Sequence, residues 1–113
     1  MIYAEILTKG DNKMVKHIIL WDIKEEYSQI EKDEIKSNIK GGLEGLKGKI
    51  PGLVDIKVYT NGLETSTADL MLDSVFESEK ALAEYAKNPL HTNIADTFVR
   101  PFTAKRNCLD FEV

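Results

Sequence analysis

Residues 15–22 are predicted to form a strand with apolar side chains on both sides. No other feature of the sequence limits the possible folds as strongly. Successive side chains of a strand point to opposite faces of a sheet. One face therefore carries His17, Ile19 and Trp21, and the other carries Ile18 and Leu20. The strand predicted over 68–76 repeats the pattern, with Leu70 and Leu72 opposite Met71 and Val75. A sheet built from these strands needs cover on both faces, because each face is too apolar for water.

A capping box, Ser28-Gln29-Ile30-Glu31, predicts the start of a helix after the first strand. Apolar residues recur along it at steps of three or four, as in a helix with one buried stripe: Ile35, Ile39, Leu43, Leu46 and Ile50. Pro51-Gly52 ends it. Glycine weakens a helix unless packing requires the missing side chain, so the glycines of the second half predict close contact with the sheet: Gly41, Gly42, Gly45 and Gly48.

The rest of the chain supplies three strands and two helices. Strands are predicted over 53–59, 68–76 and about 103–111. A short helix after Glu77-Ser78-Glu79-Lys80 turns three residues inward: Ala81, Leu82 and Tyr85. Asn88 is a good N-cap and Pro89 suits the first helical position, so a further helix begins there. It carries Leu90, Ile94 and Phe98, and Pro101 stops it.

The element order β-α-β-β-α-α-β predicts an α+β, ferredoxin-like fold with one antiparallel sheet and its helices on one face. The helices can cover only that face. The other face should therefore meet a second sheet, and the simplest supplier is another copy of the chain. We expect a homodimer with branched and aromatic strand residues in its interface.

Composition limits the classes of function. A chain of 113 residues with 42% apolar residues fits one domain with one core. The net charge of −4 is spread along the chain, which argues against a nucleic-acid partner. No apolar run approaches the roughly 18–20 residues of a membrane span, and the signal-peptide layout is missing, so we expect a cytoplasmic protein. The single cysteine, Cys108, excludes an intrachain disulfide and a thiolate cluster; we expect a buried small hydrophobe.

Two histidines and a tyrosine are the candidate catalytic residues. His17 lies in the first strand, Tyr85 near the end of one helix and His91 in the first turn of the next. The break at Asn88-Pro89 could turn Tyr85 and His91 toward one place. Histidine titrates near neutral pH and tyrosine donates a hydrogen bond without carrying charge, so the three could form a small acid/base site. Each also fits a structural role with its polar atoms satisfied.

The chain resembles the stress-responsive A/B barrel family, also called Dabb domains, from Val15 to about Glu112. The resemblance predicts an N-terminal extension over 1–13 and a Dabb domain over 14–113. The residues that carry it occur in the family's order and spacing: Val15-Lys16-His17-Ile18-Ile19-Leu20-Trp21, Pro51-Gly52-Leu53, Ala68-Asp69-Leu70-Met71-Leu72, Phe76-Glu77-Ser78, Tyr85, Asn88-Pro89-Leu90-His91 and Asp110-Phe111-Glu112. The family implies a homodimer whose two sheets form an α/β barrel.

The chain is similar to olivetolic acid cyclase-type members at three positions, His17, Tyr85 and His91. Those members close a linear polyketide by aldol condensation with a histidine and a tyrosine. Such a reaction needs a base beside a carbonyl and a donor for the oxyanion, which a neutral imidazole and a phenol can supply. One departure is Leu70, where the cyclase has a third-strand histidine.

Three classes of function stay open at this point. The first is a dimeric protein with an apolar pocket for a small organic ligand, with cofactor-free, cyclase-like acid/base chemistry. The second is a non-catalytic stress-associated oligomer, and the third, by fold analogy, a small monooxygenase-like or haem-degrading barrel. Further residues that could line a pocket are Trp21, Asp69, Leu70 and Phe76, although Asp69 also fits a strand end. No cofactor is expected, and two separate histidines without a carboxylate cluster predict no structural metal site.

Residues 1–13 lie outside the resemblance. Ile2-Tyr3-Ala4-Glu5-Ile6-Leu7 favours a strand, and Gly10-Asp11-Asn12 could turn it back along an edge. We expect an accessory strand or an arm on the partner.

Overall fold

The structure, a computed structural model, describes residues 13–113. The elements follow in the predicted order: β1 (Val15–Ile23), α2 (Gln29–Glu44), β2 (Leu53–Tyr59), β3 (Leu70–Phe76), α3 (Glu79–Lys87), α4 (Pro89–Ile94), a π-helix η1 (Ala95–Val99) and β4 (Thr103–Glu112). The accessory strand expected over residues 2–7 lies outside the described residues. None of the described helices has the length and apolar character needed to cross a bilayer.

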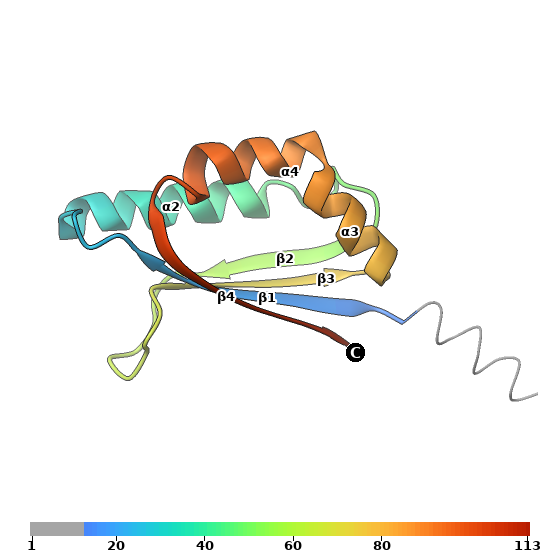
Figure 1. Cartoon of the computed structure of the whole chain (residues 1–113), viewed down its shortest axis with the longest axis horizontal. Coiled ribbons are helices and arrows are strands. Elements are labelled where there is room, and N and C mark those ends of the chain that lie inside the picture. Colours follow the sequence, from blue (N-terminus) through green and yellow to red (C-terminus); the bar gives the residue numbers. More distant parts are fainter. Residues whose placement is uncertain (1–12) are drawn as a thin grey trace, which may run out of the picture.

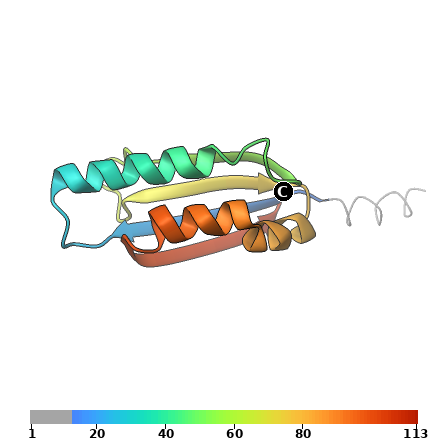
Figure 2. The same cartoon turned by 90° about the horizontal axis from the view of Figure 1, so that it is seen from above.

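The four strands form one antiparallel sheet in the order β2-β3-β1-β4. All the helices lie on one face of this sheet, and the opposite face is open (Figure 1). Seen from above, α2 and α4 run side by side along the strands, with α3 at one end (Figure 2). The predicted ferredoxin-like α+β fold is confirmed.

Strand pairing defines the two faces of the sheet. Ile19 lies opposite Leu72 on β3 and Cys108 on β4, and these positions belong to the face under the helices. The alternate residues form the outer face, on the side without helices: Ile18, Leu20, Met71, Val75, Leu109 and Phe111. A Lys16–Asp73 ion pair of 2.9 Å lies among them. Both faces are therefore apolar, as the alternation predicts.

The core lies between the sheet and α2. The capping box is present: Ser28 accepts from the backbone N–H of Glu31, whose carboxylate accepts from the Ser28 N–H. All five apolar residues of the predicted stripe are buried. The helix itself ends at Glu44 rather than at the proline, because Gly45 caps it and Gly48 has a φ of 81° that turns the chain.

The glycines of α2 do not pack against the sheet, so that expectation is wrong. A Cβ added at Gly42 would come within 2.9 Å of Ile94 and 3.3 Å of Phe98, while one at Gly41 would meet nothing within 4 Å. The close contact is therefore between α2 and the helix that follows Pro89. Leu90 of that helix is exposed, and its buried residues are Ala95 and Val99.

The π-helix continues α4 without a break. Its diagnostic bond runs from the Arg100 N–H to the Ala95 carbonyl oxygen over 2.8 Å, five residues back along the chain. Thr103 then donates its hydroxyl to the Val99 carbonyl oxygen, which ties the end of the helix to the start of β4. The helix thus reaches the sheet edge in a fixed orientation.

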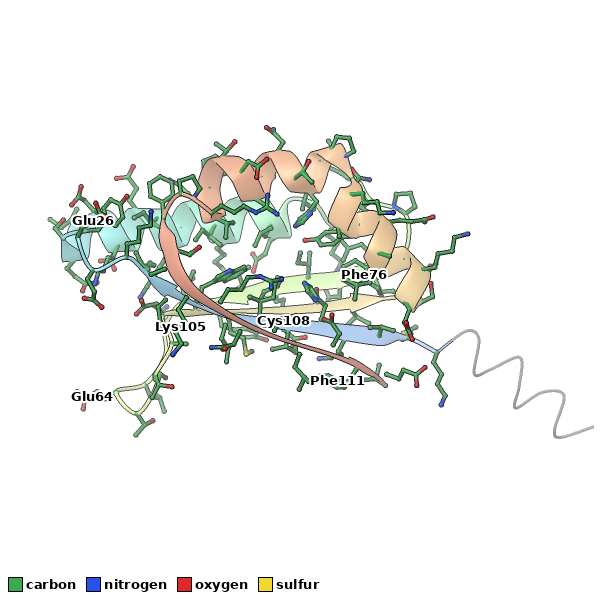
Figure 3. The ribbon with its side chains drawn as sticks, viewed as in Figure 1. Glu26, Glu64, Phe76, Lys105, Cys108 and Phe111 are labelled. Atoms are coloured by element: carbon green, nitrogen blue, oxygen red, sulfur yellow. The ribbon has the colours of Figure 1, made fainter. Side chains whose placement is uncertain are left out.

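Strand β4 is an edge strand, exposed at almost every position. Among the described strands it pairs with β1 alone, and it lies outside the helix layer for most of its length (Figure 2). Cys108, expected to be a buried hydrophobe, is exposed on this strand (Figure 3). The expectation is wrong because the sequence does not reveal which strand the helices leave uncovered.

Candidate functional site

A cavity of about 200 Å³ lies between the sheet and the helices. The three candidate catalytic residues, His17 of β1, Tyr85 of α3 and His91 of α4, all line it. Trp21, a candidate pocket residue, also lines it, together with apolar side chains of α2 and the later helices. Three chemically active side chains from three separate elements thus meet at one cavity.

The break between α3 and α4 brings Tyr85 and His91 together. Asn88 ends α3 and caps α4, with its side-chain oxygen accepting from the Leu90 N–H over 2.9 Å, and Pro89 occupies the first turn. The Tyr85 and His91 rings lie 4.1 Å apart between centroids, at 32°. The Tyr85 hydroxyl and His91 Nδ1 are buried, and neither has a hydrogen-bond partner among residues 13–113.

Burial sets the charge states of this pair. It lowers the pKa of His91 below its ordinary value of 6.5, while a backbone hydrogen bond at Ala86 acts in the opposite direction. The imidazole is therefore neutral at pH 7 and its unpaired nitrogen can accept a proton. Burial raises the pKa of Tyr85, so the phenol keeps its proton and can only donate or accept hydrogen bonds.

His17 approaches the cavity from the sheet. Its side chain is 10% exposed, and its Nδ1 contacts a carboxylate oxygen of Asp110, the residue directly opposite it on β4. Its ring packs edge-on against Phe76 at 6.2 Å. A carboxylate bonded to one ring nitrogen holds the imidazole in one orientation.

The remaining candidate pocket residues lie outside the cavity lining. Phe76 is fully buried in the core beneath α3, with its ring 4.8 Å from that of Tyr85 (Figure 3). Leu70 is buried in the core. Asp69 closes the end of the β1–β3 pair: its carboxylate accepts from the Ile23 N–H, and its own N–H donates to the Trp21 carbonyl oxygen.

The sequence indicated Asp110 only as part of the family resemblance, and it did not indicate two arginines that line the cavity, Arg100 and Arg106. Arg100 is paired with Asp96 one turn earlier. Arg106 lies opposite Trp21 in the β1–β4 register. The β1–β4 register would have identified Arg106 and Asp110 as site residues. Alternation along β4 places both on the same face of the sheet as His17 and Trp21.

The fold and the cavity define a ferredoxin-like α+β protein with three candidate acid/base residues lining a cavity between its layers. Residues 15–113 match the stress responsive A/B barrel domain family, and the chain belongs to that family. No curated protein matches it significantly.

Solved structures share the fold. A dimeric ferredoxin-like protein of unknown function from Bacteroides fragilis is 28% identical, with a TM-score of 0.82 over 88% of this chain and 96% of its own. A hydroxynitrile lyase from Passiflora edulis is 20% identical, with a TM-score of 0.68 over 90% and 94%. A protein from Bacteroides thetaiotaomicron described as a possible oxidoreductase is 14% identical, with a TM-score of 0.69 over 90% and 99%.

Proposed function

We propose that the cavity binds a small organic carbonyl compound and that His91 and Tyr85 perform cofactor-free acid/base chemistry on it. The observation that carries this proposal is a pair of neighbouring residues lining one cavity, Tyr85 and His91, whose hydroxyl and Nδ1 are buried without a hydrogen-bond partner among residues 13–113. Buried polar groups are almost always hydrogen-bonded, so two exceptions side by side call for a functional explanation. A bound carbonyl compound would satisfy both.

The cavity size limits the ligand. An apolar cavity of about 150 Å³ holds one benzene molecule, so about 200 Å³ suits a single ring with a small substituent. Drug-sized ligands occupy pockets of roughly 300–1,000 Å³. The proposed substrate class is therefore smaller than the linear polyketides of cyclase relatives.

The chemistry is a proton transfer beside the carbonyl group. His91 Nδ1 accepts a proton from the carbon next to the carbonyl, and the electron pair of the broken C–H bond moves to the carbonyl oxygen. The Tyr85 hydroxyl donates a hydrogen bond to the resulting enolate oxygen. The protonated imidazole then returns its proton to that carbon. Alternatively, the enolate carbon attacks a second carbonyl, whose electron pair moves to its oxygen, and the imidazolium protonates the alkoxide, as in an aldol closure.

Removing the Tyr85 hydroxyl alone tests this assignment. In Tyr85→Phe the ring packing is kept and a buried hydroxyl without a partner disappears, so stability should hold or rise by up to about 1–3 kcal/mol. Deuterium exchange at the methyl group of acetophenone in D2O, followed by NMR, should fall by roughly 10²–10³-fold. Loss of stability with unchanged exchange would contradict the proposal.

Tyr27→Phe serves as the matched control, because its ring packs against Phe102 away from the cavity. Wild-type protein that binds acetophenone without exchanging its protons would favour a non-catalytic ligand-binding oligomer. Haem binding through an imidazole would favour the oxygenase alternative.

We propose in addition that the protein works as a homodimer joined through the outer face of the sheet. Leu20, Leu109 and Phe111 on this face are 38%, 64% and 41% exposed. The Bacteroides fragilis protein with the same fold is described as dimeric. A second copy would bury this open apolar face, which water would otherwise contact.

A charge at the centre of this face should separate the subunits. Leu20 lies on β1 between Met71 and Asn107, so Leu20→Lys places an ammonium group in the proposed interface. Sedimentation at micromolar concentration should show a dimer for the wild type and a monomer for the variant. Ile30→Lys makes the same replacement on α2, at a residue that is 81% exposed, and should stay dimeric. A folded wild-type monomer would refute the proposal.

A further inference from the structure

Three metal-ligating side chains meet beside the cavity on the helix-facing side of the sheet. His17 lies directly opposite Asp110 on β4, and Cys108 precedes Asp110 by two positions, which places it on the same face. One donor atom from each residue lies within 4.8 Å of the other two. Spacing along the sequence did not predict this group, because strand pairing brings together residues about ninety positions apart.

The separations of the donor atoms suit a tetrahedral ion. Zinc bonds of about 2.3 Å to sulfur and 2.0–2.1 Å to nitrogen or oxygen place two ligand atoms about 3.5 Å apart when one is sulfur. Cys108 Sγ is 3.7 Å from His17 Nδ1 and 3.5 Å from the Asp110 carboxylate oxygen. The His17 and Asp110 atoms are in direct contact and would separate to about 3.3 Å around the ion.

The group combines one fixed ligand with two adaptable ones. His17 is 92% buried, its ring packs against Phe76, and its carbonyl oxygen accepts from the buried Ser74 hydroxyl over 2.9 Å. The Asp110 side chain is 44% exposed, and Cys108 is exposed on the edge strand. The carboxylate can therefore move by the small distance required, and water can reach a fourth coordination position.

We propose that His17, Cys108 and Asp110 bind a divalent zinc ion, with water as the fourth ligand. Thiolate, imidazole and carboxylate together favour zinc over magnesium or calcium, which prefer oxygen ligands. Binding converts the thiol to a thiolate and releases its proton, while His17 coordinates through Nδ1. Arg106 lies on the same face of β4 and is the positively charged side chain next to the proposed site. This site is separate from the proposed proton transfer, which uses His91 and Tyr85.

Cobalt(II) is the probe, because thiolate coordination gives an intense near-ultraviolet charge-transfer band and tetrahedral geometry gives visible bands. Untagged full-length protein, reduced and free of metal, should bind one equivalent of Co²⁺ with both signals, and Zn²⁺ should displace it. Since Cys108 is the only cysteine, the charge-transfer band reports on this site alone.

Cys108→Ala should abolish the charge-transfer band, and Asp110→Asn should weaken Co²⁺ and Zn²⁺ binding at least about tenfold. Glu112→Gln, at the next helix-facing position of β4, is the matched control and should bind as the wild type does. Circular dichroism on each variant shows that the fold is kept. A wild type without a saturable charge-transfer band at micromolar cobalt, or an Asp110→Asn variant with unchanged affinity, would overturn the proposal. Neither result depends on acetophenone exchange.

Discussion

Replacing His91 with alanine is expected to lower the acetophenone exchange rate by roughly 10²–10⁴-fold, the usual contribution of a positioned general base. Its Nδ1 makes no hydrogen bond among the described residues, so the loss of folding free energy should be small beside the loss of rate. NMR exchange assays and urea unfolding on the same samples separate the two effects. Asn93→Ala, an exposed residue of the same helix, is the control.

The pH dependence gives this expectation a second readout. The wild-type exchange rate should fall as acid protonates His91, with a midpoint below 6.5, because burial lowers its pKa. In the same pH range the unfolded chain binds more protons than the folded protein at this residue, so His91 also makes the stability fall as the pH is lowered. His91→Ala should remove both effects. Equal destabilisation at every pH with the exchange rate preserved would show a purely structural histidine.

The second large effect is expected from Phe76→Ala, which should lower the free energy of unfolding by about 3–5 kcal/mol. Phe76 is fully buried, and its ring contacts those of Tyr85 and His17, so truncation leaves a void beside both. Urea unfolding should be compared at one protomer concentration, because a dimer's stability depends on it.

Phe76→Leu keeps most of the volume and should lose markedly less stability than Phe76→Ala. The proposed acid/base chemistry also predicts reduced exchange in Phe76→Ala, because the Tyr85 ring loses its support. If Phe76→Ala lowered the free energy of unfolding by less than about 1 kcal/mol, the rings of Tyr85 and His17 would be held by other contacts.

The elements of the fold could be predicted because their signals are local. The capping box and the apolar steps place α2, Asn88-Pro89 places the start of α4, and alternation assigns the faces of β1 and β3. Tyr85 and His91 could be placed near each other for the same reason, since only the helix break separates them.

The features that the sequence did not predict depend on contacts between segments far apart in the chain. Arg106 lines the cavity and Asp110 contacts His17 because β4 pairs with β1 in one register, and no short sequence pattern fixes that register. The exposure of Cys108 follows from the edge position of β4, which depends on where the helices lie. Gly42 was assigned to the sheet because sequence shows that a side chain is missing, but not which neighbour fills the space.

The π-helix at Ala95–Val99 has a consequence for how the length of this chain can vary. A turn closed by a bond five residues back holds one residue more than an α-helical turn. Loss of one residue there would restore a regular α-helix with little rotation of the residues beyond it, because the wider turn absorbs the extra residue locally. Ala95 and Val99 face the cavity on this segment. Larger insertions and deletions should therefore collect in the exposed loop between β2 and β3, while the helical segment can differ by the single residue that the π-turn holds.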